Sequence, residues 1–180
     1  MKIGIITTTI RDGRQSLNIA NWLNDLAQKR NDGNTYEVVD LKDFNLPVMG
    51  GEATEAQLAG VAAWGEKINE LDGFVFVTAE YNHSPSGAIK NALDFLKPQF
   101  TNKAAALVGY GGVGGARAIE QMRMILAELQ VATVQRNVNL FLAVDFKNFT
   151  EFAPKDHHAS MVDEMFTQLT NWSKALKPLR

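Results

Sequence analysis

The amino-acid sequence predicts an α/β fold, a three-layer sandwich in which a five-stranded parallel sheet carries helices on both faces. Short apolar runs of strand length alternate along the chain with longer segments whose apolar residues recur at helical spacing. One stretch, residues 73–78 (GFVFVT), is continuously β-branched or aromatic after its first residue, Gly73, as expected for a central strand covered on both sides. Alternating strands and helices imply right-handed crossovers and a parallel sheet.

Each element has its own local signal. We expect strands at residues 3–6, 36–41, 73–78, 103–110 and 138–144, and helices at 17–26, 54–68, 86–96, 116–129 and 162–176. Thr54 and Ser86 have the side chains that cap helix N-termini, and Pro98 ends the third helix. The segment 145–158, rich in Phe, is expected to be irregular.

Composition limits the function. The 180 residues, 46% of them apolar, suffice for one core, so we expect a single domain spanning 1–180. With 18 basic and 20 acidic residues, the chain gives no electrostatic reason to expect nucleic acid or a membrane surface as partner. Cysteine is absent, and we see neither a signal peptide nor a transmembrane segment, so we expect a cytoplasmic protein.

The first candidate site is the polar loop 7–16, which joins the first strand to the first helix. Free backbone N–H groups and the positive end of a helix dipole point into such a loop. Hydroxyls of Thr8, Thr9 and Ser16 and the guanidinium groups of Arg11 and Arg14 make it a candidate phosphate site. The alternative is that Ser16 only caps the helix and both arginines are solvated. The pattern is not a P-loop.

The second candidate follows the third strand, at residues 79–87. Backbone groups from Ala79 to Asn82, the ring of Tyr81 and the amide of Asn82 suit a flat heteroaromatic ligand. A turn followed by the cap Ser86 explains the same residues structurally. We expect His83 at the surface or facing a substrate, because no nucleophile elbow accompanies it.

The third candidate is the glycine-rich segment 109–115 after the fourth strand. It matches G-x-G-x-x-G only nominally, since a dinucleotide fingerprint follows the first strand. Its glycines allow backbone to pass close beside a ligand held by the other two loops. In the strand order 2-1-3-4-5, winding reverses between the first and third strands, and ligands bind at the carboxyl ends there.

His157 and His158 beside Asp156 are expected to be solvated, and we predict no metal site.

Three stretches together resemble the NADPH-dependent FMN reductase family of flavodoxin-like proteins. They are Thr9-x-Arg11-x-x-Arg14, Glu80-Tyr81-Asn82-His83-Ser84 with Gly87, Lys90 and Asn91, and Tyr110-Gly111-Gly112-Val113-Gly114-Gly115 with Arg117. The resemblance covers nearly the whole chain, and the middle motif is specific. It implies a flavoprotein oxidoreductase in which FMN is reduced by NADPH or NADH and reoxidised by a quinone, a flavin, an azo or nitro compound, or a metal oxyanion.

The resemblance also implies the roles of single residues. Carried over by position, Thr9, Arg11, Ser16 and Leu17 hold the FMN phosphate, with Arg14 close by. Ala79, Glu80, Tyr81 and Asn82 border the isoalloxazine ring, and Tyr110, Gly111 and Gly112 close its far side. No catalytic side chain is implied, because the cofactor supplies the hydride chemistry.

Family members form homodimers or homotetramers, and Phe95, Phe100 and Phe149 are candidates for such an interface, although core packing explains each of them as well. The alternative function is a flavodoxin-type electron carrier without NAD(P)H activity. Such carriers are usually strongly acidic, and this chain is nearly neutral.

Overall fold

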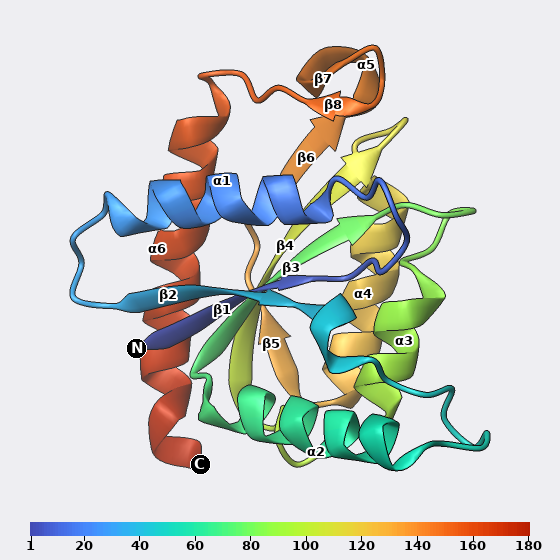
Figure 1. Ribbon diagram of the computed structural model, residues 1–180. Coiled ribbons are helices and arrows are strands. Elements are labelled where there is room, and N and C mark those ends of the chain that lie inside the picture. Colours follow the sequence, from blue (N-terminus) through green and yellow to red (C-terminus); the bar gives the residue numbers. More distant parts are fainter.

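A computed structural model describes residues 1–180 and places a parallel sheet between two layers of helices (Figure 1). The strands of the sheet are β1 (Lys2–Thr7), β2 (Thr35–Asp40), β3 (Gly73–Ala79), β4 (Lys103–Gly111), β5 (Val131–Thr133) and β6 (Val138–Phe141). The helices are α1 (Ser16–Gln28), α2 (Glu55–Glu70), α3 (Gly87–Asp94), α4 (Ala116–Glu128), α5 (Leu142–Asp145) and α6 (His158–Leu176). Short 3-10 helices lie at Leu41–Phe44 and Lys177–Leu179. A separate antiparallel pair is formed by β7 (Phe146–Lys147) and β8 (Glu151–Phe152).

The strand order β2-β1-β3-β4-β5, parallel throughout, confirms the predicted order 2-1-3-4-5. The fifth position differs from the prediction, because it is shared by two short strands. β5 pairs with the first residues of β4, and β6 pairs with its last residues. The expected strand 138–144 ends at Phe141, whose N–H donates to the Asp145 carboxylate (2.7 Å) as the chain turns into α5.

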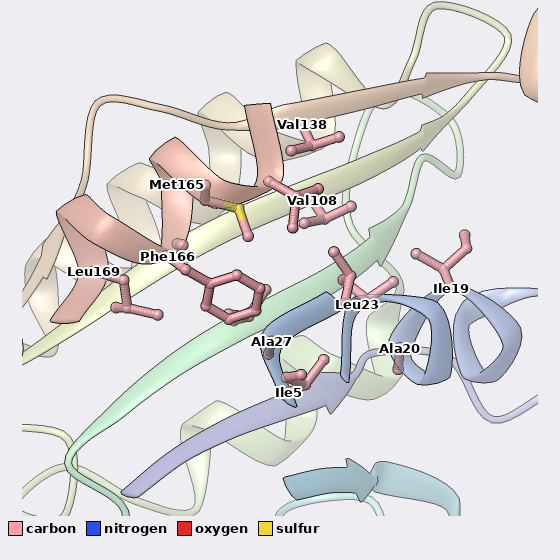
Figure 2. Packing of buried hydrophobic residues seen from close by; sticks show 14 of the residues in the cluster. Ile5, Ile19, Ala20, Leu23, Ala27, Val108, Val138, Met165, Phe166 and Leu169 are labelled. Atoms are coloured by element: carbon pink, nitrogen blue, oxygen red, sulfur yellow. The ribbon is translucent and has the colours of Figure 1, made fainter. Parts of the chain in front are cut away.

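Side chains alternate between the two faces of the sheet, as the period of a strand requires. On one face, Ile5 and Val108 pack with residues of α1 and α6, including Leu23 and Phe166 (Figure 2). The opposite face packs against α2, α3 and α4, with Phe74 and Phe76 from β3 in its core. Both faces of β3 are buried, which confirms the prediction that it is a central strand.

Local signals for helix starts are confirmed at two helices. Thr54 and Gln57 form a capping box at α2, and the Ser86 hydroxyl accepts the N–H of Ile89 at α3. The third helix ends at Asp94, two residues earlier than expected, although Leu96 remains buried. None of the helices has the length and apolar character needed to cross a membrane.

The connection before α6 is more ordered than the sequence indicates. β7 and β8 form a hairpin there, and α6 begins at His158, earlier than expected. His158 was expected in solvent, which is wrong: it is buried, and its Nε2 lies 2.8 Å from the buried Asp145 carboxylate. Of the candidate interface residues, Phe100 is fully buried in the core, Phe95 packs against the core, and Phe149 is exposed.

Candidate functional site

The loop after β1 brings buried hydroxyl groups to the carboxyl edge of the sheet. Thr8 donates to the carbonyl of Val77 in β3 (2.9 Å), which ties the loop to the neighbouring strand. The hydroxyls of Thr9 and Ser16 lie 2.7 Å apart, and both residues are buried. Polar groups of this kind are costly to bury without partners, so the pair marks a prearranged polar spot beneath the surface.

Helix α1 begins at this spot without a side-chain cap. Its N-cap residue is Gln15, and the Ser16 hydroxyl is directed to Thr9 instead of to the helix amides, so the interpretation of Ser16 as a mere cap is wrong. No acceptor faces the N–H groups of Ser16, Leu17 and Asn18. Leu17 itself is half-buried in the first turn. These free donors, together with the helix dipole, favour an anion.

The two arginines of the loop take different positions. Arg14 forms an ion pair with Asp40 at the end of β2, and both side chains are largely buried. Burial would raise the pKa of Asp40, but hydrogen bonds from Thr7, the Lys42 amide and Arg14 hold it below its usual range. Arg14 therefore holds the loop in place. Its ion pair with Asp40 uses some of its N–H groups, and only the others remain for a ligand.

Arg11 reaches across to the second loop. Its Nε donates to the Tyr81 hydroxyl (2.8 Å), and its guanidinium carbon lies 5.9 Å from the centre of the Tyr81 ring. No carboxylate neutralises it, in contrast to Arg14. Arg11 thus carries a positive charge that no carboxylate neutralises, and it connects the first loop to the second.

The loop after β3 is a tight turn. Tyr81 and Ser84 exchange two backbone hydrogen bonds of 2.8 and 3.0 Å, and Asn82 and His83 both have positive φ, at 49° and 67°. The geometry matches a type I′ turn, which few side chains other than Asn tolerate at low cost. Before the turn, Ala79 is buried in β3 and the Glu80 N–H donates to the carbonyl of Tyr110 (3.0 Å).

Helix α4 holds this turn from outside. Arg117 donates to Glu80 through its backbone N–H (3.1 Å) and through Nε (2.6 Å), and its NH1 lies 2.7 Å from His83 Nε2. Gln121 accepts from the Ser84 hydroxyl and donates to the His83 carbonyl. His83 is exposed and lies in contact with Arg117. Its place at the surface was predicted.

The loop after β4 completes the edge. Gly111 is buried and Gly112 exposed, and a β-carbon at Gly112 would meet nothing within 4 Å. At Gly115, φ is +70° and a β-carbon would lie 2.5 Å from the Tyr110 amide nitrogen, so glycine is required where the loop folds back on the strand. The backbone is open at Gly112, whereas Gly114 and Gly115 pack closely against Asn139 and Tyr110.

Tyr110 precedes this loop and turns its side chain toward α1. Its residue is 6% exposed, and the hydroxyl has no hydrogen-bond partner. Burial raises the pKa of the phenol, while the hydroxyls of Thr9 and Ser16 and the charge of Arg11 act in the opposite direction. The phenol therefore belongs to the surroundings of the first loop.

An apolar recess of about 330 Å³ adjoins the site. It is bordered by Ile10 from the first loop and by Ala88 and Asn91 from α3, with Leu41 and Leu46 opposite. The side chain of Asn91 donates to the Pro47 carbonyl (2.8 Å) and accepts the N–H of Met49 (2.9 Å), which pins the loop before α2. Sequence reasoning missed this cavity, because its walls come from three separate segments.

The three predicted loops thus meet at one edge of the sheet, where winding reverses between β1 and β3. The first provides hydroxyls, free amides and a cation, and the second and third provide backbone around an open surface. Sequence reasoning also missed Asp40, which lies 26 residues from its partner Arg14. Nowhere do three or more His, Asp or Glu residues gather as a metal site would require.

Comparison with known proteins gives concordant results. The family model for NADPH-dependent FMN reductases matches residues 1–143. An NAD(P)H-dependent FMN reductase of Schizosaccharomyces pombe is 36% identical over 138 residues, which cover 72% of this chain and 68% of that protein. An NADPH azoreductase of Bacillus sp. OY1-2 is 32% identical over 143 residues, 78% of this chain and 76% of that protein. Further relatives are named as quinone oxidoreductases.

The fold also has solved counterparts. The flavoenzyme NAD(P)H:(acceptor) oxidoreductase FerB of Paracoccus denitrificans superposes with a TM-score of 0.72, at 19% sequence identity, over 97% of both chains. At this identity the likeness concerns the fold alone, and it agrees with the observed strand order and the two helical layers.

Proposed function

The chain belongs to the NADPH-dependent FMN reductase family, and on that premise we propose that it binds FMN and passes a hydride from NAD(P)H to a small oxidised acceptor. One observation carries the proposal. Buried hydroxyls of Thr9 and Ser16 lie at the uncapped start of α1, at the point where the strand order reverses. A phosphate monoester is the ligand that such a combination of free amides, hydroxyls and helix dipole favours.

The residues present fit such a cofactor, and we assign them accordingly. Thr9, Ser16, the Leu17 amide and Arg11 hold the phosphate, and Arg14 fixes the loop from its ion pair with Asp40. The second and third loops border the isoalloxazine ring mainly through backbone. The residues on these two sides are Ala79, Glu80, Tyr81 and Asn82, and Tyr110, Gly111 and Gly112.

Bound FMN supplies the hydride chemistry, so the chain needs no nucleophile of its own. The contribution of the protein is position and electrostatics. Backbone N–H groups of the second and third loops stabilise negative charge on the ring system, and Arg11 adds a positive charge nearby. The open surface at Gly112 leaves space for the nicotinamide and the acceptor to occupy one position in turn.

We propose quinones and azo compounds as acceptors, because relatives are named for both. Nitro compounds, free flavin and metal oxyanions are further acceptors of the same class.

We further propose that residues 1–180 act as one FMN-binding domain, that the protein assembles as a homodimer or homotetramer, and that it works in the cytoplasm. The exposed Phe149 is then a candidate contact between subunits.

The test is direct oxidation of NADPH by the purified protein. With FMN present, we expect NADPH consumption that depends on an added quinone or azo dye, at typical enzyme turnover numbers of about 1 per second or more. Parallel initial-rate lines are expected when donor and acceptor are both varied, and intersecting lines would contradict alternate occupancy. A protein that holds FMN but cannot oxidise NADPH is an electron carrier instead.

A further inference from the structure

The phenol of Tyr110 is a buried donor without an acceptor. The residue is 94% buried, and its hydroxyl makes no hydrogen bond within the protein. An unpaired hydroxyl in the interior costs about 1 to 3 kcal/mol of folding free energy. Buried polar groups of this kind are rare, so its position calls for a physical reason.

The aromatic ring of Tyr110 packs against other side chains of the protein. Phe146 from β7 stacks against it, with 6.1 Å between ring centres and 28° between ring planes. The side chain lies in the core cluster on the face of the sheet covered by α1 and α6, together with Ile19 of α1. With one face against Phe146 and only 6% of the residue exposed, the ring offers little surface to a flavin. Only its hydroxyl remains to interact with a ligand.

The hydroxyl lies among the polar groups of the first loop. Burial raises the pKa of the phenol, whereas the hydroxyls of Thr9 and Ser16 interact with the phenol oxygen and lower its pKa, and the positive charge of Arg11 has the same effect. Thr9 and Ser16 share one hydrogen bond, which uses one of their two protons. The proton of the Tyr110 hydroxyl has no acceptor within the protein. The N–H groups of Ser16, Leu17 and Asn18 at the start of α1 also lack an acceptor, so the first loop holds several donors that a ligand could use.

We infer that Tyr110 binds the phosphate of the cofactor and not its ring: the phenol donates its O–H to a phosphate oxygen beside Thr9 and Ser16. A phosphate dianion provides the several lone pairs that this group of donors lacks. The inference rests on the proposed function and revises the position-based role of Tyr110, which placed it beside the isoalloxazine. The backbone of Tyr110 still borders the third loop.

The test compares FMN with riboflavin, which has the same ring without the phosphate. Dissociation constants for both are measured by flavin fluorescence on the full chain freed of flavin. For Tyr110→Phe we expect FMN affinity to fall about 10- to 100-fold, the value of a hydrogen bond to a charged group, with riboflavin affinity unchanged. Tyr36→Phe is the matched control, because Tyr36 is also a buried phenol but donates to Asp32 (2.6 Å) at a distant turn.

Thermal unfolding of the flavin-free variants gives an independent readout. Removal of an unpaired buried hydroxyl does not lower the free energy of unfolding, so we expect Tyr110→Phe to melt at the wild-type temperature or above. Tyr36→Phe loses a hydrogen bond and should melt lower.

Three results would overturn the inference about Tyr110. An equal loss for FMN and riboflavin would assign the phenol to the ring, and unchanged affinities for both would remove it from the site. A lower melting temperature for flavin-free Tyr110→Phe would give the hydroxyl a structural partner. If the wild-type chain binds neither flavin, the proposed function fails and takes this inference with it, which separates the two failures.

Discussion

Glu80 carries its charge in a nearly dry position, with 5% of its side chain exposed. Burial would raise the pKa of this carboxyl, but hydrogen bonds from the Arg117 side chain and backbone hold it below its usual range. Since Glu80 precedes the turn 81–84, the pair with Arg117 decides how firmly this border of the site is held.

We expect Arg117→Met to lower the free energy of unfolding by about 1 to 2 kcal/mol at neutral pH, because a buried carboxylate loses its main donor. A lowered folded-state pKa stabilises the protein above the ordinary pKa of Glu, and this contribution is lost as pH falls through the folded value. The difference between wild type and variant should thus shrink on acidification below about pH 4.5. Urea unfolding at several pH values measures it.

Lys97→Met serves as control, because Lys97 and Glu128 form an ion pair with side chains 61% and 80% exposed. Such exposed pairs contribute at most about 1 kcal/mol, with little effect expected here. A loss that is equal for Arg117→Met and Lys97→Met, or one that does not change with pH, would contradict the assigned role of Glu80.

At the scale of elements, α2 shows how contact overrides propensity. Gly60 lies within this helix, where glycine is about 1 kcal/mol less favourable than alanine. A β-carbon at Gly60 would lie 2.0 Å from the carbonyl oxygen of Phe44, in the 3-10 helix that α2 crosses. Backbone cannot yield as a flexible side chain does. The glycine therefore allows α2 to approach the segment that carries one wall of the apolar recess.

We expect Gly60→Ala to destabilise the protein by about 1 to 3 kcal/mol, in spite of the gain in helix propensity. For a chain of this size each kcal/mol lowers the melting temperature by about 2 to 4 °C. Gly65→Ala in the same helix is the control, since its β-carbon would meet Leu96 at an ordinary 3.4 Å. Calorimetry should show no loss, or a gain, for Gly65→Ala. Equal melting temperatures for the two variants would disprove the close approach at Gly60.

The sequence predicted elements well where the signal is local. Apolar period marked five helices, and side-chain caps marked the starts of α2 and α3. Prediction from the sequence failed where contacts between distant residues determine the ends of a strand or the burial of a side chain. The strand β5 is only three residues long and exists because β4 lies beside it, and the strand expected at 138–144 stops where Asp145 accepts the Phe141 N–H. His158 is buried together with its hydrogen-bond partner Asp145, which lies 13 residues earlier in the chain.

At the scale of the whole molecule, the strand order determines where the site lies. The order 2-1-3-4-5 follows from alternating strands and helices plus a resemblance in three motifs, and it brings three loops to one edge. The meeting of these loops could therefore be predicted from the sequence, and the cofactor contacts of their residues stay a prediction. What could not be predicted is how their side chains are used: Arg14 pairs with Asp40, and the Tyr110 side chain packs in the core between the sheet and helices α1 and α6.

The central claim is that this edge holds one FMN that NADPH reduces. The most direct measurement is the absorbance spectrum of the protein equilibrated with FMN and separated from free flavin, followed by anaerobic addition of NADPH. We expect about one FMN per chain, with micromolar or tighter affinity, and loss of the flavin band on reduction. A colourless protein, or a bound flavin whose band persists with excess NADPH, would contradict the account.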